Sequence, residues 1–275
     1  MKENALKKII LIIGNTFLVF FALTPFVWML IISLTSRADF LITGEVEYTL
    51  QNYRNILTNT SLHFGNYFFN SLIVSLITSI FVTIIASLAG YAVSRLQFPG
   101  RIVVPVAILA LSMFPPISIV GYLYRFFSDT GLLNTHIALI LPYTALTVPL
   151  ALWINMSYFS QIPRELDKAA LIDGAGRIGT LTKIVLPLAL PGIFSSFLLV
   201  FIACFNEFLL ALMLTIDYRA QTLPVGIALF QGLHGEIPWG NLMAASALTA
   251  VPLVVVTIIF QKYIVQGLIG GAVKG

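Results

Sequence analysis

The residues that could do chemistry gather in one polar segment of an otherwise apolar chain. It reads Glu165-Leu-Asp-Lys-Ala-Ala-Leu-Ile-Asp-Gly174 and is followed by Ile184-Val-Leu-Pro187. The segment mixes acids and bases, but no nucleophile is paired with a base. This composition favours a binding surface over a catalytic centre. We interpret the segment as the place where a membrane-buried body is held by a partner in water.

Other motifs that signal chemistry are weak. Gly174-Ala-Gly176-Arg-Ile-Gly179 spells G-x-G-x-x-G, but no strand precedes it, so it does not indicate a dinucleotide site. No G-x-x-x-x-G-K-[ST] occurs, so the chain has no P-loop of its own for ATP. The three histidines are isolated and the single cysteine has no partner. The sequence predicts no catalytic residue, no metal site and no cofactor bound by this chain.

The amino-acid composition predicts that most of the chain lies in a lipid bilayer. Hydrophobic residues make up 59% and charged residues 9% of the 275 residues, whereas a globular domain has about 25% charged residues. The net charge is +4, but the cations are spread along loop edges without a basic stripe. A nucleic-acid partner is therefore not expected.

Six stretches reach the length of about 20 apolar residues that a spanning helix needs. They are residues 9–33, 69–92, 102–124, 137–159, 190–213 and 241–260. The pattern predicts an all-α polytopic membrane protein in which residues 1–275 form one transmembrane domain. Pro115-Pro116, Pro142 and Pro149 are expected to break the third and fourth spans.

The distribution of lysine and arginine predicts the orientation. Eleven of the 15 Lys and Arg residues lie at the termini or in the connections at 93–101 and 160–189. The positive-inside rule therefore places both termini and the polar loop 160–189 in the cytoplasm.

Spacing within the polar loop predicts a short helix. Pro163 suits a first helical position, and Gly174 suits a left-handed C-terminal cap. Between them, Leu166, Ala169 and Ala170 share a face at i, i+3 and i+4. The charged rim of this face consists of Glu165, Asp167, Lys168 and Asp173. The alternative is a solvated connector.

A second feature is an acid inside the fifth apolar stretch. Glu207, next to Asn206, lies midway along it. An ionised carboxylate at the bilayer centre costs at least ~2.5–3.5 kcal/mol, so the side chain should face a pathway or a partner. Two interpretations remain open: a polar lining of a translocation route, or an interhelical hydrogen bond with the glutamate protonated.

These motifs together resemble a known family. Residues 168–187 resemble the Glu-Ala-Ala loop of ABC-importer permeases. The shared pattern is Lys168-Ala-Ala, three residues, Gly174, nine residues, Ile184, one residue and Leu186-Pro187. Further similar segments are Leu96-Gln-Phe-Pro-Gly100, Asn206-Glu207-Phe208 and the ending Gly271-Ala-Val-Lys-Gly275. The resemblance runs the length of the chain and is strongest to maltose- and trehalose-type permeases. One departure is Lys168, where the family has glutamate; Glu165 or Asp167 would then meet a basic residue of the ATPase.

The resemblance implies a type I ABC importer permease fold. The polar loop would be the coupling helix, seated in a groove of a cytoplasmic ATPase subunit. Its residues would be Glu165, Leu166, Lys168, Ala169, Ala170, Asp173, Gly174, Ile184, Leu186 and Pro187. In such a permease Asn206 and Glu207 are the candidates for the translocation path, with the interhelical hydrogen bond of Glu207 as the alternative. Gly271 and Lys274 would extend along the ATPase pair, unless the terminus is frayed.

The same resemblance implies partners and a substrate class. A second homologous permease, two ATPase subunits that bind ATP and Mg, and an extracytoplasmic sugar-binding protein would complete the complex in the prokaryotic cell membrane. The substrate would be a di- or oligosaccharide.

Three alternatives stay open. A permease of the same family could carry another solute, such as glycerol phosphate or a polyol. A gradient-driven secondary transporter would show internal repeats and paired broken helices, and none is found. A membrane enzyme would need acids, histidines or a nucleophile clustered at one depth, and Glu207 stands almost alone.

Overall fold

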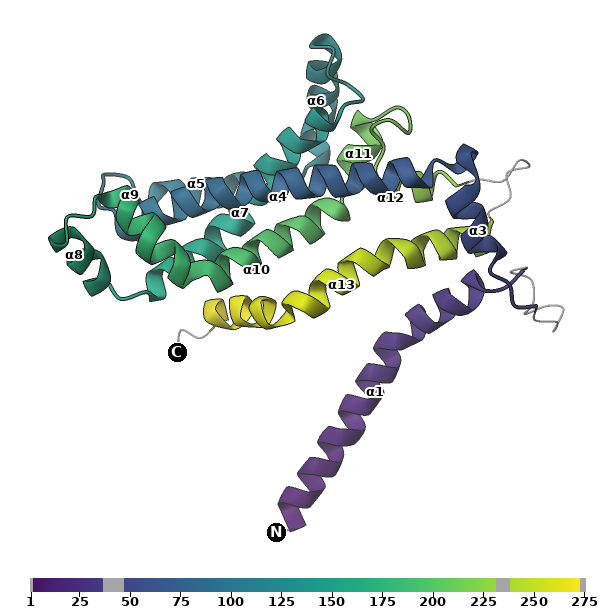
Figure 1. The fold of residues 1–275 in the computed structure, drawn as a ribbon, viewed down its shortest axis with the longest axis horizontal. Helices are drawn as coiled ribbons and strands as arrows, with labels where there is room; N and C mark the ends of the chain where they lie inside the picture. The colour runs from purple at the N-terminus through teal and green to yellow at the C-terminus, as the bar shows by residue number, and fades with distance from the viewer. Residues whose placement is uncertain (1, 37–46, 231–237, 273–275) are drawn as a thin grey trace. The chain divides into compact units, whose positions relative to one another are not determined.

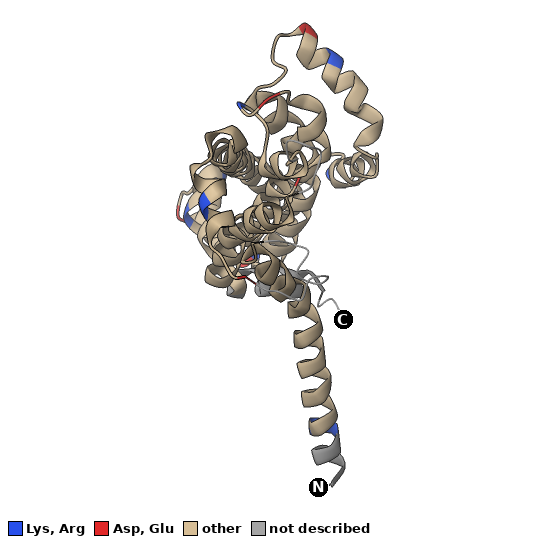
Figure 2. Ribbon diagram, turned by 90° about the vertical axis from the view of Figure 1, so that its right-hand side faces the viewer, with Lys and Arg blue, Asp and Glu red and all other residues tan. Residues whose placement is uncertain are grey.

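A computed structural model describes residues 2–36, 47–230 and 238–272, with side chains from residue 7 to residue 261 within these ranges. The described residues are mainly helical and contain no strand beyond one isolated bridge between Thr35 and Tyr48. Five of these helices are long and apolar enough to cross a membrane, or six if the bent pair α5 and α6 is one span. Figure 2 shows helices that are uncharged over most of their length. The all-α membrane class is confirmed.

The chain divides into two compact units, each described by itself. The first contains residues 1–64 and 227–252. Its longest helix, α1 (Lys2–Ser33), exposes its apolar side chains along the stretch from Lys7, as a lipid-facing helix does. The short helix α3 (Gln51–Thr58) is tied to the end of α1, because the Asn52 amide donates to the carbonyl oxygens of Ser33 (2.9 Å) and Thr35 (2.8 Å).

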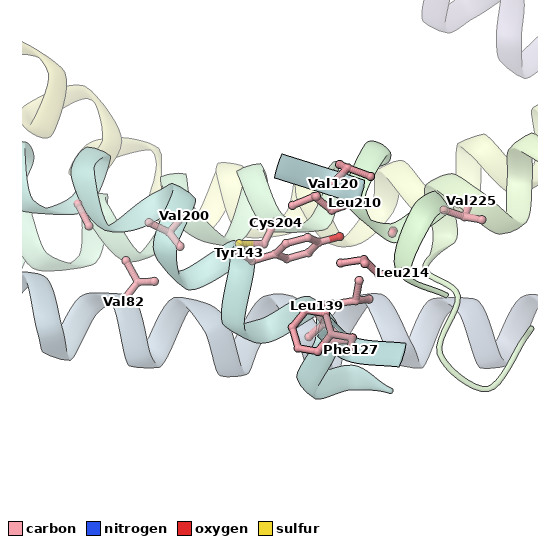
Figure 3. Close-up of a cluster of buried hydrophobic side chains, with 14 of the residues drawn as sticks. Val82, Val120, Phe127, Leu139, Tyr143, Val200, Cys204, Leu210, Leu214 and Val225 are labelled. Atoms are coloured by element: carbon pink, nitrogen blue, oxygen red, sulfur yellow. The ribbon is translucent and has the colours of Figure 1, made fainter. Parts of the chain in front are cut away.

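The second unit contains residues 65–226 and 253–275 and holds the main core. Helices α4 (Phe64–Arg95), α7 (His136–Gln161) and α10 (Leu186–Phe205) run through it (Figure 1). Tyr143 lies among the buried side chains of this core (Figure 3). The labelled members are Val82, Val120, Phe127, Leu139, Tyr143, Val200, Cys204, Leu210, Leu214 and Val225.

A buried polar triad fixes how these three helices face one another. The Asn155 amide of α7 donates to the Ser87 hydroxyl of α4 at 3.2 Å. The Ser196 hydroxyl of α10 donates to the Asn155 amide oxygen at 2.9 Å. Asn155 and Ser196 have no exposed surface and Ser87 is buried. Interhelical hydrogen bonds of this kind contribute roughly 0.6 kcal/mol each, up to about 1.7, within a membrane.

A glycine allows α7 and α10 to approach closely. A Cβ atom at Gly192 would lie 2.1 Å from Cγ of Tyr158 and 2.3 Å from Cδ2 of the same ring. Cγ is the fixed root of the ring, so a methyl group there can be accommodated only if the ring or the helix moves.

Gly192→Ala is therefore expected to destabilise the second unit by about 1–3 kcal/mol, the usual range for overpacking. The measurement is thermal unfolding of the purified protein in lipid. Gly179→Ala is the matched control, since a Cβ there meets only the Ala175 methyl group at an ordinary 3.6 Å. Equal stability of both variants would contradict the close approach.

The third span is broken at Pro115-Pro116, as predicted, but it covers residues 103–129 and not the expected 102–124. It consists of α5 (Val103–Ser112) and α6 (Ile117–Asp129), bent by 90°. Pro115 and Pro116 account for the break, because proline lacks a backbone donor and disfavours helix in the residue before it. Helix α5 alone is about 15 Å long and cannot cross a hydrocarbon core of about 30 Å.

The fourth and fifth spans also differ from expectation. Helix α7 continues through Pro142 and Pro149, so the predicted break of the fourth span is wrong. Packing against neighbouring helices lets a membrane helix tolerate proline. The fifth span, expected at 190–213, ends with α10 at Phe205, and a separate helix α11 (Leu209–Leu214) follows. Helix α13 (Trp239–Ala272) covers the stretch 241–260.

Candidate functional site

The polar segment forms the predicted short helix. Helix α8 (Glu165–Ile172) is closed by Asp173 and then Gly174, whose φ is +79°. The Gly174 amide donates to the carbonyl oxygen of Leu171 (3.2 Å), and the Ala175 amide donates to that of Ala170 (2.9 Å). This pair of bonds is the Schellman cap, which needs a left-handed residue. The predicted glycine cap is confirmed, so α8 has a defined end.

The second half of the loop is part of the body of the unit. Helix α9 (Arg177–Thr180) leads into a π-helical turn, η2 (Leu181–Val185), which continues without interruption into α10. Leu181 and Val185 are buried in a cluster with Tyr91, Phe159 and Ala189. The loop expected at 160–189 is thus helical from Arg177 onward. Displacement of its second half would be transmitted directly to α10.

Most of the predicted coupling residues are accessible on α8. Glu165, Leu166, Lys168, Ala169, Asp173 and Gly174 are exposed. Ile184 and Leu186 are half-buried and Pro187 is exposed. Ala170 differs, because it is only 3% exposed and packs inward. The expected face of Leu166, Ala169 and Ala170 therefore loses its third member.

Three exposed apolar residues of this region were not among the predicted coupling residues. Leu171 is 56%, Ile172 86% and Ile178 78% exposed. They lie beside the Gly174 turn. The contact face predicted for this segment was instead based on its two alanines. The available signal was the pair of large apolar residues Leu171-Ile172, which ends two positions before the capping glycine. We call Leu166, Leu171, Ile172 and Ile178 the apolar patch of the loop.

A buried arginine holds α8 against the membrane helices. Arg95, the last residue of α4, is 2% exposed in its side chain and pairs with Asp167 of α8 at 3.0 Å (Nη1 to Oδ2). Its other terminal nitrogen, Nη2, donates to the carbonyl oxygens of Phe159 (2.5 Å) and Ile162 (2.6 Å), at the end of α7. One guanidinium thus joins α4, α7 and α8.

This pairing corrects the expected role of Asp167. From the sequence, either Glu165 or Asp167 is expected to meet a basic residue of a partner. Asp167 is 21% exposed and pairs with Arg95 of its own chain. Glu165 is exposed and is the acid that remains available.

Glu207 is held by three hydrogen bonds within the chain. Its carboxylate accepts from the amides of Leu210 (Oε1, 2.8 Å) and Ala211 (Oε2, 3.1 Å) in α11, and from the Tyr143 hydroxyl of α7 (Oε2, 2.6 Å). The geometry supports the interhelical hydrogen bond. All three partners donate to the side-chain oxygens of Glu207. Asn206 is exposed, and its amide donates to the carbonyl oxygen of Ile202 at 2.8 Å.

The loop ahead of α7 is tied to the loop behind α11. Asn134, with φ of +60°, accepts from the amides of Ile216 (2.8 Å) and Asp217 (3.3 Å) and donates to the Asp217 carboxylate at 3.0 Å. The bond from Asn134 and one from the Arg219 amide lower the pKa of Asp217. A depressed carboxyl pKa adds stability above the unfolded-state value, which is lost as the pH falls through the folded value.

The C-terminal candidate residues are only partly described. Gly271 lies in the last turn of α13. Lys274 lies outside the described residues. Their expected contact with an ATPase stays a prediction.

The fold defines the class of protein. Over 96% of this chain and 98% of the other, the structure matches a chain of a bacterial ABC transporter involved in the import of the acidic polysaccharide alginate, with a TM-score of 0.78 at 20% identity. A second structure of a bacterial alginate ABC transporter, in complex with an alginate pentasaccharide-bound periplasmic protein, matches with a TM-score of 0.66. At this identity the likeness shows the fold, which is that of a type I ABC importer permease.

Sequence comparison then shows the family. Residues 83–270 match the family described as binding-protein-dependent transport system inner membrane component, and the chain belongs to it. The trehalose/maltose transport system permease protein MalG of Thermococcus litoralis is 54% identical over the full length of both chains. The trehalose permease SugB of Mycobacterium tuberculosis is 40% identical over 95% of this chain and 96% of its own. This chain is therefore a transport subunit that passes several times through the inner membrane.

Proposed function

We propose that this chain forms half of the membrane pathway of an ATP-driven importer for a disaccharide of the trehalose or maltose kind. The observation that carries the proposal is α8, a capped and accessible helix with an apolar patch and a charged rim. It is linked to α4 and α7 through Arg95, and the segment after it continues through η2 into α10. Full-length identity of 54% to a trehalose/maltose permease supports the substrate class. The chain is not an enzyme in this proposal.

The proposed partner of α8 is a cytoplasmic ATPase subunit. Leu166, Leu171 and Ile172 would enter an apolar groove, with Glu165, Lys168 and Asp173 at the rim. Lys168 is exposed and is free to meet an acid there. Closure of two ATPase subunits, which hold ATP and Mg, would move α8 as a rigid body. Arg95 would pass this motion to α4, and η2 would pass it to α10.

The proposed orientation follows from charge. The α8 end of the unit carries Arg101, Arg164, Lys168, Arg177 and Lys183, which the positive-inside rule assigns to the cytoplasm together with both termini. A second permease would complete the pathway. A sugar-binding protein would deliver substrate from outside, and the tail with Gly271 and Lys274 would lie along the ATPase pair.

Asn206 is proposed to face the route of the sugar. It is exposed at the break between α10 and α11, where the backbone is not helical. Non-helical backbone at membrane depth is tolerated where it lines a cavity or is buried in protein. Its amide oxygen is available to a sugar hydroxyl, because its amide nitrogen is the atom bound to Ile202.

A permease for a different solute is the second candidate. The sulfoquinovosyl glycerol permease SmoH of Agrobacterium fabrum is 38% identical over 92% of this chain and 89% of its own. Uptake of labelled trehalose, maltose and sulfoquinovosyl glycerol by the complete complex separates the two. Uptake of sulfoquinovosyl glycerol alone would refute the disaccharide assignment while leaving the coupling role of α8 in place.

The coupling role predicts a large effect at Ile172. Ile172→Glu is expected to lower sugar-stimulated ATP hydrolysis of the complete complex in lipid more than tenfold, because a buried interface centre does not accept an unpaired charge. The substitution should not disturb folding, as Ile172 is 86% exposed. Ile216→Glu is the matched control: it changes an isoleucine that is 65% exposed, in the loop after α11. If both variants hydrolyse ATP as the wild type does, α8 is not the coupling element.

A further inference from the structure

A cavity of about 340 Å³ lies beside the polar loop, between α4, α5 and α7. It does not belong to the apolar patch of the loop or to the break near Asn206. Arg101, two residues before α5, and Arg164, just before α8, both line it. No aspartate or glutamate does.

The two arginines have little charge compensation within the chain. In the described part of the chain neither forms an ion pair, and Arg164 makes only a long bond of 3.4 Å to the carbonyl oxygen of Ser94. Asp167, the nearest acid in sequence to Arg164, is already paired with Arg95. Two cations at one cavity, with no acid among the residues that line it, favour an anion at this place. Guanidinium groups also match the geometry of phosphate.

The rest of the cavity is an apolar groove. Ile102, Val106 and Leu109 line it from α5 at positions i, i+4 and i+7, and Trp153 lines it from α7. Ile102 is 70% and Val106 59% exposed, so this wall is open from the side. The wall of α5 extends about 10 Å from the arginines, at 1.5 Å per residue. Tryptophan is enriched at the boundary between headgroups and hydrocarbon.

A charged end joined to an apolar groove is the shape of an amphipathic ligand. Basic pockets between transmembrane helices bind anionic headgroups. We propose that this cavity binds one anionic phospholipid, with its phosphate between Arg101 and Arg164 and an acyl chain along α5 against Trp153. The lipid belongs to the leaflet on the α8 side and braces α5 and α7 next to the helix that we assign to coupling. This inference does not depend on the transported solute.

The experiment uses phosphatidylglycerol with a photoreactive acyl chain. The full-length chain, with the subunits assembled on it, is placed in phosphatidylcholine nanodiscs that contain the probe. After illumination, labelled peptides from residues 102–109 and 150–156 are quantified by mass spectrometry, so partner subunits do not contribute to the signal. Photoreactive phosphatidylcholine forms the second arm, and phosphatidylglycerol with an excess of inorganic phosphate forms the third.

We expect phosphatidylglycerol, and not phosphatidylcholine, to label both peptides in the wild-type chain. The pair Arg101→Gln and Arg164→Gln should reduce this labelling about 30-fold, as expected from two surface cations near anionic lipid. Val106→Trp should reduce it as well by filling the groove, with both charges intact. Arg125→Gln is the matched control and should have no effect, because Arg125 is 84% exposed and lies opposite Asp129 on α6.

Several results would overturn the proposal. Equal labelling by both lipids would show that the groove binds acyl chains but does not distinguish an anionic headgroup from phosphatidylcholine. Complete competition by inorganic phosphate would assign the arginines to a free anion. Absence of labelling in the wild-type complex would mean that a partner helix covers the groove. Unchanged labelling in the double arginine variant would show that Arg101 and Arg164 do not bind the headgroup.

Discussion

Arg95→Met is expected to uncouple ATP hydrolysis from transport. It should also destabilise the second unit, where α4, α7 and α8 meet, by about 3 kcal/mol. The substitution removes the ion pair to Asp167 and the bonds to the carbonyl oxygens of Phe159 and Ile162 at once. Removing one partner of a buried pair typically costs 3–5 kcal/mol, because the remaining charge is left uncompensated. The lower end applies here, since Asp167 keeps 21% exposure. Arg95 Nε and Asp167 Oδ1 also have no hydrogen-bond partner of their own.

Two measurements test this prediction. Thermal unfolding of the second unit should show the loss of stability, and sugar-stimulated ATP hydrolysis should fall if α8 no longer follows α4. Arg95→Lys should recover little of either property, because one ammonium group cannot reproduce the planar fork that contacts three acceptors.

A double-mutant cycle with Asp167→Asn isolates the pair itself. We expect a coupling energy of about 0.5–3 kcal/mol between Arg95→Met and Asp167→Asn, which is the range for residues in one ion-pair network. Additive effects would show that the carbonyl bonds of Arg95, and not the ion pair, hold α8 in place. Arg125→Met is the control for a lost cation: its partner Asp129 is exposed and the pair is worth little.

The membrane class could be predicted from the sequence because it depends on local features of the chain. Runs of apolar residues and the glycine cap of α8 depend on residues close to one another along the chain, so they can be read directly. The 90° bend between α5 and α6 shows the limit. Pro115 and Pro116 predict a break, but the angle depends on what packs beside the helices. Pro142 and Pro149 predict breaks in the same way, and α7 continues through both.

The candidate site was less predictable because its contacts join distant parts of the chain. Arg95 and Asp167 are 72 residues apart, and Tyr143 and Glu207 are 64 residues apart. In the sequence Arg95 counts only as one more cation near a membrane boundary, and Asp167 as one more acid on a charged rim. Likewise, periodicity places Ala170 on one face with Leu166, but it cannot show which side of α8 faces the body of its own chain.

Glu207→Ala is expected to lower stability by about 3 kcal/mol through two losses in one place. The amides of Leu210 and Ala211 would lose the carboxylate that caps α11, and a lost cap costs about 1 kcal/mol. The Tyr143 hydroxyl would be left without its acceptor in a residue that is 1% exposed. A buried hydroxyl in that state costs about 1–3 kcal/mol.

Two further variants separate these losses. Tyr143→Phe removes the hydroxyl and leaves the cap intact, so it should cost less than Glu207→Ala. The double variant Tyr143→Phe with Glu207→Ala should be more stable than the sum of the single losses predicts, because no orphaned hydroxyl remains. Glu207→Gln should fall between the wild type and Glu207→Ala, since its amide oxygen can still accept from α11.

The same variants decide whether Glu207 also touches the transported solute. A capping role predicts that Glu207→Gln shifts the unfolding midpoint and leaves the KM for sugar-stimulated ATP hydrolysis near its wild-type value. A role in the pathway predicts a raised KM with an unchanged midpoint. For the unfolding midpoint alone, Asn206→Ala is the neighbouring control, because Asn206 is exposed and bonded only within its own helix, so its loss should cost under about 0.5 kcal/mol. A Glu207→Ala protein as stable as the wild type would show that the carboxylate does not cap α11, and would return Glu207 to the translocation route.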